Sequence, residues 1–121
     1  MRIANPIAVI GEDIAVEYLR QKGYRIIERN FRKKYEEIDI VAIDGSTLVF
    51  IEVKTRRSDT YGTPFEGISP FKVHHLVQLA QYYKMTHKNL PDDMRIDAVG
   101  VKLKLDNKME SIEHLENISG F

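Results

Sequence analysis

Two short apolar segments joined by a turn constrain this chain most, because each carries charged residues where a buried strand is normally apolar. The segments are residues 38–43 and 48–54, and Asp44-Gly45-Ser46 lies between them. Aspartate, glycine and serine are typical of the tight turns that connect antiparallel strands. The two segments therefore predict a β-hairpin that carries acidic and basic side chains.

The number of residues in the turn decides which of these charges face one another, because side chains alternate between the two faces of a strand. Of the two possible two-residue turns, the earlier pairs Asp39 with Phe50 and the later pairs Asp39 with Glu52. In both registers Asp39, Glu52 and Lys54 project from the same side of the hairpin. A turn with an odd number of residues would separate them.

Two carboxylates on one side of a hairpin repel each other and need a neutralising group. At about 5 Å the repulsion is about 3 kcal/mol at an effective dielectric constant near 20. A proton, a cation or water can relieve it. Hard cations such as Mg²⁺ take carboxylate oxygens and waters, and a nearby lysine can orient a nucleophilic water. Asp39, Glu52 and Lys54 thus form a candidate metal-hydrolysis site, although these residue types are also common on surfaces.

Composition narrows the class of protein. The 121 residues suit one domain, and the absence of cysteine excludes disulfides, thiolate zinc sites and cysteine nucleophiles. The sequence has neither a long apolar segment for membrane insertion nor a signal-peptide pattern, so we expect a cytoplasmic protein and no membrane partner. Eighteen basic and eighteen acidic residues balance, which weighs modestly against strong non-specific nucleic-acid binding. Residues 20–34 are nevertheless strongly basic and predict a basic face.

Helix caps, turn residues and hydrophobic periodicity predict the order α-β-β-β-α-β-β. Asn5-Pro6 begins the first helix, in which Gly11 permits close approach to a sheet and Glu12 borders the buried stripe. We interpret residues 55–67 as a loop over the candidate site. The expected elements are a helix from Asn5-Pro6 to Gly23, a strand at 24–32, the hairpin, a helix from Ser69-Pro70 to residues 89–91, a strand at 94–103 and an edge strand at 112–118.

Motifs in this order extend over most of the chain. They are Gly11-Glu12, Gly23-Tyr24, residues 29–32, 37–42 and 48–56, Gly62-Thr63-Pro64, Ser69-Pro70 with Lys72, Arg95-Ile96-Asp97 and residues 114–117. With these motifs the chain resembles the YraN-type family of small bacterial proteins. That family belongs to the restriction-endonuclease-like PD-(D/E)xK superfamily and is related to archaeal Holliday-junction resolvases. The resemblance implies a single nuclease-like α/β domain at 1–121, with a central mixed β-sheet flanked by helices.

The resemblance also implies roles for individual residues. Asp39 and Glu52 would bind Mg²⁺ or Mn²⁺ together with the backbone carbonyl of Val53, and Lys54 would position the attacking water. Glu12 corresponds to a helix glutamate that joins the catalytic site in resolvase-like nucleases. The implied phosphate contacts are Arg29, Arg32, Arg56 and Lys72.

The implied reaction is phosphodiester hydrolysis in structured or branched DNA, by a protein that could act as a homodimer. One residue departs from the family pattern: Glu36 stands at a usual glycine and could repel phosphate. Two other hypotheses stay open. The chain could bind nucleic acid with little or no catalysis, or it could be a protein-interaction adaptor in which Asp39 and Glu52 are solvated edge charges.

Overall fold

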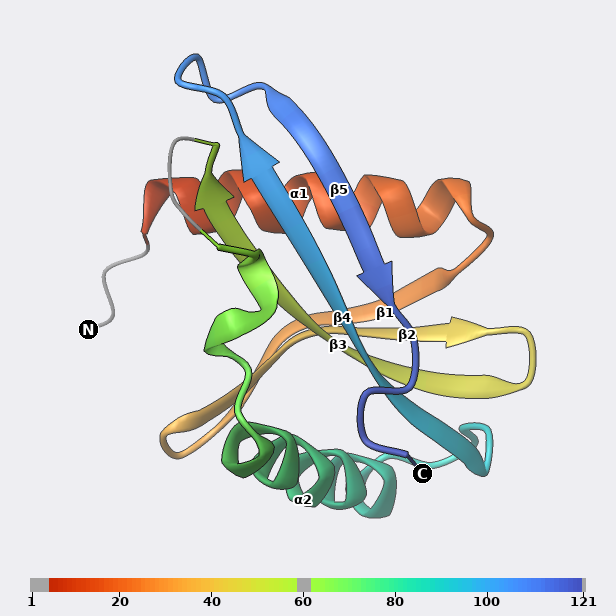
Figure 1. Cartoon of the computed structure of the whole chain (residues 1–121). Coiled ribbons are helices and arrows are strands. Elements are labelled where there is room, and N and C mark those ends of the chain that lie inside the picture. The colour runs from red at the N-terminus through yellow and green to blue at the C-terminus, as the bar shows by residue number, and fades with distance from the viewer. Residues whose placement is uncertain (1–4, 59–61, 121) are drawn as a thin grey trace.

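The computed structural model describes residues 5–58 and 62–120, which form two α-helices, one short 3₁₀ turn and five strands (Figure 1). The predicted order of elements is confirmed. Asn5 caps the first helix by accepting the Ile7 N–H, and Ser69 caps the second by accepting the Lys72 N–H. The elements are α1 Pro6–Gln21, β1 Arg25–Lys33, β2 Glu36–Asp44, β3 Thr47–Arg57, η1 Pro64–Gly67, α2 Pro70–Thr86, β4 Asp93–Leu103 and β5 Met109–Leu115.

The strands form one open mixed sheet in the order β1-β2-β3-β4-β5. Neighbouring strands are antiparallel except β3 and β4, which are parallel because α2 connects them. This single α/β domain is consistent with a restriction-endonuclease-like fold, as predicted. In the described part of the chain, neither helix has the length and hydropathy required to cross a membrane.

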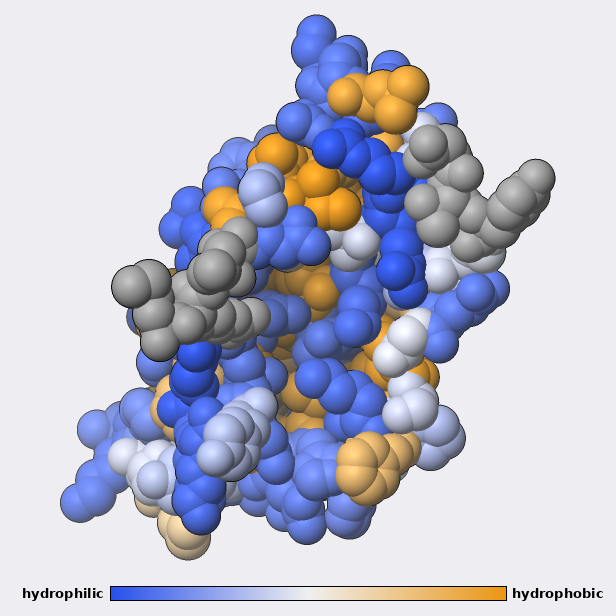
Figure 2. Space-filling model, turned by 90° about the vertical axis from the view of Figure 1, so that its left-hand side faces the viewer, coloured by the Kyte–Doolittle hydropathy of each residue, from blue (hydrophilic) through white to orange (hydrophobic). Residues whose placement is uncertain are grey.

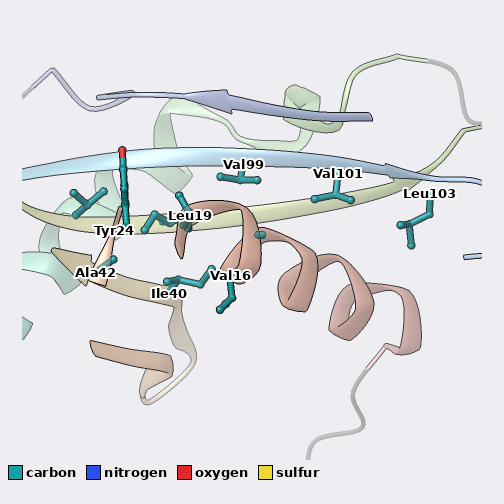
Figure 3. Packing of buried hydrophobic residues seen from close by; sticks show 11 residues of the cluster. Val16, Leu19, Tyr24, Ile40, Ala42, Val99, Val101 and Leu103 are labelled. Carbon is teal, nitrogen blue, oxygen red and sulfur yellow. The ribbon is translucent and has the colours of Figure 1, made fainter. Parts of the chain in front are cut away.

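The two helices cover opposite faces of the sheet and bury a hydrophobic core on each face (Figure 1). On the α1 face, Leu19 and Val16 pack against aliphatic side chains of β2 and β4 (Figure 3). On the α2 face, Phe50 of β3 packs against Leu76 and Tyr83 of the helix. Each aliphatic side chain buried in this way contributes about 1.5–3 kcal/mol to folding.

Gly11 brings α1 close to β3, as the sequence predicts. A β-carbon at this position would overlap the side chain of Thr55, so any larger residue would push the helix away from the strand. Since Glu12 follows directly, the same close approach determines where the Glu12 carboxylate lies relative to the sheet.

Three predicted segments have wrong boundaries. The second helix ends at Thr86 and not at residues 89–91. The predicted loop at 55–67 begins later, because β3 continues to Arg57 through its parallel ladder with β4, and Pro64–Gly67 form η1. Residues 59–61 of that prediction lie outside the described part of the chain. The edge strand begins at Met109 and ends at Leu115, whereas the prediction placed it at 112–118. It ends there because the Asn117 backbone leaves the ladder with a φ of 55° and donates its N–H to Asp97.

Candidate functional site

The register of the β2–β3 hairpin places the two carboxylates opposite each other. Asp44 pairs with Thr47, so the two-residue turn is Gly45-Ser46, the later of the two possibilities. The ladder continues to the pair Ile40–Ile51. One residue further the same register sets Asp39 against Glu52, but here the Asp39 Oδ2 atom accepts the Val53 backbone N–H at 2.8 Å. At this level of the hairpin, β3 therefore donates a hydrogen bond to the side chain of Asp39.

The neighbouring strand β1 is also irregular at this point. Asn30 adopts a left-handed φ of 56°, and the ladder with β2 passes from Arg29–Ile40 to Phe31–Ile38 without an Asn30–Asp39 pair. As a result, Ile40 packs on the α1 face while Ile38 packs on the α2 face. Regular alternation, which the prediction assumed, breaks at Asp39. Asparagine tolerates this backbone conformation better than most residues.

Burial makes the charged forms of both acids unfavourable. Glu52 is 6% exposed, and the loss of solvent, together with the Asp39 charge, raises its pKa to about 7. Loss of solvent also raises the pKa of Asp39 to about 6, and the nearby Glu12 charge adds to this despite the hydrogen bond from Val53. The two acids therefore compete for a proton close to neutral pH. Glu52 is thus a buried acid rather than a solvated edge charge, whereas Asp39 is partly buried.

Two lysines lie beside Glu52. The Lys54 Nζ atom is 3.8 Å and the Lys72 Nζ atom is 3.9 Å from the Glu52 Oε1 atom. Both charges lower the pKa of Asp39 and Glu52 but do not cancel the effect of burial. The predicted grouping of Asp39, Glu52 and Lys54 on one side of the hairpin thus agrees with the structure, and Lys72 joins them from α2.

A divided depression surrounds the carboxylates. On one side, a cavity of about 400 Å³ is lined by Asp39, Glu52 and Lys72. On the other, a cavity of about 500 Å³ is lined by Asp39, Val53 and Glu12. Because Asp39 belongs to both, it stands at their boundary. Figure 2 shows this side of the molecule, where hydrophilic residues surround a central hollow.

Glu12 lies in the second cavity but is engaged by a basic residue. Its Oε1 atom is 3.3 Å from the Arg29 Nη2 atom, and Arg29 also contacts Asp13 at 2.7 Å. The side chain of Glu12 is only 13% exposed. The structure therefore brings Glu12 close enough to influence Asp39, while Arg29 is held by two carboxylates on α1.

The other predicted phosphate contacts are divided between paired and exposed residues. Arg32 forms an ion pair of 2.7 Å with Glu37. Arg56 is exposed at the end of β3, next to Gly67 of η1, which also approaches Lys54. The described part of the predicted loop therefore borders the site at its lysine. Glu36, which replaces the usual glycine, lies 2.9 Å from the His75 Nδ1 atom.

The donor set suits a hard divalent cation that keeps several waters. The described residues contain no cluster of three or more histidine and acidic side chains arranged to hold a metal. Asp39 and Glu52 offer two carboxylates that line one cavity. Mg²⁺ is commonly bound by one or two carboxylates plus water. The N–H and C=O of one residue leave a strand on the same side, so the Val53 carbonyl also faces β2. These oxygens fit the expected ligands.

Sequence reasoning missed two residues that shape this site. Asn30 lies at the break in β1. The only sequence signal for this break was an asparagine between charged and aromatic residues of a strand. Glu37 lies beside Asp39 in both cavities and binds Arg32. The motif at 37–42 includes Glu37, but its ion pair could not be predicted, because its partner is on another strand.

The fold and site define a small α/β protein with two neighbouring acids, one buried and one partly buried, at a break in its sheet. The chain belongs to the uncharacterised protein family UPF0102, whose profile matches residues 11–101, and this confirms the resemblance to the YraN-type family. A UPF0102 protein of Alkaliphilus oremlandii is 40% identical over 111 residues, which cover 92% of this chain and 95% of the relative.

Two further relatives are similar over most of their length. A UPF0102 protein of Caldicellulosiruptor saccharolyticus is 43% identical over 107 residues, covering 88% of this chain and 91% of the relative. A UPF0102 protein of Geobacter sulfurreducens is 44% identical over 112 residues, covering 92% of this chain and 86% of the relative. These names establish the family.

Proposed function

We propose that this protein is a metal-dependent nuclease that hydrolyses phosphodiester bonds in structured or branched DNA. The observation that carries the proposal is the pairing of the buried Glu52 with the partly buried Asp39, in a cavity that also receives Lys72. Burying two like charges costs stability, and such a cost is typical of sites that bind a cation. Mg²⁺ or Mn²⁺ would bind Asp39, Glu52 and the Val53 carbonyl, and would supply Lewis acidity and a more acidic water.

The surrounding residues fit the remaining tasks. Lys54 lies within 3.8 Å of Glu52, where its ammonium group can orient a water or stabilise negative charge as it develops. Lys72 borders the same acid, and Arg56 is exposed nearby to contact phosphate. Arg29 and Arg32 would reach phosphate only in competition with their carboxylate partners. Such contacts position a nucleic acid without reading its sequence.

Cleavage of end-labelled DNA tests the proposal. Four-way junctions, flaps, single strands and linear duplexes are incubated with wild type, Asp39→Asn, Lys54→Ala or Glu110→Gln, with Mg²⁺ or Mn²⁺. Wild type should cleave a branched substrate, and loss of Lys54 should slow cleavage about a hundredfold or more. Glu110, an exposed acid on β5, is the matched control and should leave the rate unchanged.

Metal binding provides the second readout. Calorimetric titration with Mn²⁺ should give clearly weaker binding for Asp39→Asn and Glu52→Gln than for wild type and Glu110→Gln. Binding of DNA without cleavage across all substrates would favour a nucleic-acid-binding module instead. Cleavage that survives in Asp39→Asn would contradict the assigned site.

A further inference from the structure

Two aromatic rings are exposed beside the carboxylate site. Tyr35, in the turn between β1 and β2, is 103% exposed, and Phe71, in the first turn of α2, is 74% exposed. Both line a cavity of about 340 Å³ whose apolar wall includes Leu76 and Leu79. Two large exposed rings around one apolar cavity contribute little to folding and offer apolar surface to a ligand.

This aromatic cavity, defined by Tyr35, Phe71, Leu76 and Leu79, is continuous with the carboxylate site. Tyr35 and Lys72 line both the aromatic cavity and the cavity that contains Asp39 and Glu52. A single molecule could therefore place an apolar part between the aromatic rings and a charged part beside the acids.

Two acids and one lysine line the aromatic cavity, and each acid has a partner within the protein. The carboxylate of Glu36 is engaged by His75 at 2.9 Å, and that of Glu37 by Arg32 at 2.7 Å. Lys34 and Lys72 line the adjoining cavity and add positive charge. Aromatic surface next to lysines is a combination that binds single-stranded nucleic acids, because the bases stack on the rings and the lysines contact the phosphates.

The Phe71 ring is held ready for stacking by its neighbour on the helix. Its centroid is 4.4 Å from that of His75, with the planes at 63°, and His75 is in turn held by Glu36. This edge-to-face contact restricts the ring while leaving most of its surface exposed. Little side-chain entropy would then be lost when a planar ligand binds.

We propose that Tyr35 and Phe71 stack on an unpaired nucleobase next to the cleaved phosphate, so that the substrates are DNAs with unpaired or splayed bases at the cleavage point. The proposal rests on the nuclease function above and names its substrate class. In a duplex both faces of each base are covered by neighbouring bases, so aromatic side chains reach them only where the strands separate.

Binding without metal tests the stacking directly. A splayed-arm DNA carrying 2-aminopurine at its first unpaired position is compared with a blunt duplex of the same sequence, in EDTA. Wild type should change the 2-aminopurine fluorescence and prefer the splayed DNA. Phe71→Ala and Tyr35→Ala should each reduce that preference about tenfold, whereas Phe71→Tyr should keep it.

Met85→Ala is the matched control, because Met85 is exposed on the same helix but lies outside the residues that line the aromatic cavity. Equal weakening of splayed and duplex binding by Phe71→Ala would overturn the proposal. A second result would also overturn it: wild type sediments as a dimer, Phe71→Ala sediments as a monomer, and the two proteins have the same DNA preference. The rings would then contact a second copy of the chain.

The same measurements separate the two proposals. If wild type stacks on the unpaired base but cleaves no DNA with Mg²⁺ or Mn²⁺, the nuclease function is wrong and the stacking site stands. If wild type cleaves DNA and Phe71→Ala keeps the full preference for splayed substrates, the stacking site is wrong and the nuclease function stands.

Discussion

Two buried acids on adjacent strands, Glu52 on β3 and Asp97 on β4, have opposite electrostatic surroundings. Both are almost inaccessible, at 6% and 0% exposure. The pKa of Glu52 is raised to about 7, because burial and the neighbouring Asp39 charge dominate. Burial alone would also raise the pKa of Asp97, but hydrogen bonds from His114, the Asn117 N–H and Arg95 outweigh it and lower the pKa.

The partners of Asp97 form a closed network. Its Oδ1 atom accepts Arg95 Nε at 3.0 Å and the Asn117 N–H at 2.9 Å, and its Oδ2 atom accepts His114 Nε2 at 2.8 Å. The Lys22 ammonium donates to His114 Nδ1, so Nε2 carries the hydrogen that Asp97 accepts. His114 therefore joins Lys22 to Asp97 within the fold.

The comparison separates an acid that supports the fold from one that supports a site. Asp97 ties β4 to β5 and to the chain that follows, and its charge is matched by donors within the protein. Glu52 faces another acid, and its lysines stay almost 4 Å away. A buried charge that the protein itself does not compensate is the one to examine for function.

The largest expected effect is therefore on stability, at Asp97. Asp97→Asn removes the charge that Arg95 and His114 face, and should lower the free energy of unfolding by about 3–5 kcal/mol at neutral pH, as measured by urea denaturation. Asp92→Asn is the matched control: Asp92 is fully exposed and pairs with Lys84 at 3.4 Å, so its loss should leave the free energy of unfolding nearly unchanged. Similar costs for both variants would contradict the role assigned to Asp97.

Substitutions in the carboxylate site should have the opposite effect and raise the free energy of unfolding. Raised pKa values mean that the folded protein holds protons that the unfolded chain has released, so this site loses stability as the pH rises from about 4 to about 7. In the absence of metal, Asp39→Asn and Glu52→Gln should raise the free energy of unfolding near pH 8 by about 1–3 kcal/mol.

The pH dependence gives this prediction its control. Near pH 4 both acids are largely protonated in the folded protein, so the gain from Asp39→Asn should shrink toward zero. Melting temperatures across pH 4 to 8, with Glu110→Gln as the exposed control, measure the trend. A destabilising effect of Asp39→Asn near pH 8 would mean that the Val53 hydrogen bond outweighs the buried charge.

Much of the fold follows from local sequence signals. Asn5-Pro6 and Ser69-Pro70 predict the starts of both helices, and the turn around Gly45 predicts the hairpin. The two-residue turn also predicts that Asp39, Glu52 and Lys54 lie close together, and they do, although the regular alternation that this prediction assumed breaks at Asp39. The paired states of Glu12, Arg29 and Arg32 could not be predicted, since their partners depend on how α1 and the strands pack.

The break in the sheet could not be predicted from the sequence either. It requires the left-handed backbone of Asn30 on β1 and the side-chain hydrogen bond of Asp39 on β2 at the same level. Each strand taken alone fits a regular pattern. Only their combination shows that the site lies at an irregular point of the sheet.

The smallest expected effect tests whether this break serves the site. Asn30→Gly should leave the free energy of unfolding nearly unchanged, whereas Asn30→Ala should cost about 1 kcal/mol, because a β-carbon disfavours the left-handed conformation. Asn89 also has a positive φ, of 64°, but lies between α2 and β4, so Asn89→Ala is the matched control. If the break positions Asp39 for a cation, Asn30→Ala should weaken Mn²⁺ binding and Asn89→Ala should not. Equal Mn²⁺ affinities at similar stability costs would make the break a feature of the sheet alone, and the uncompensated pair of acids would then have to account for the site without it.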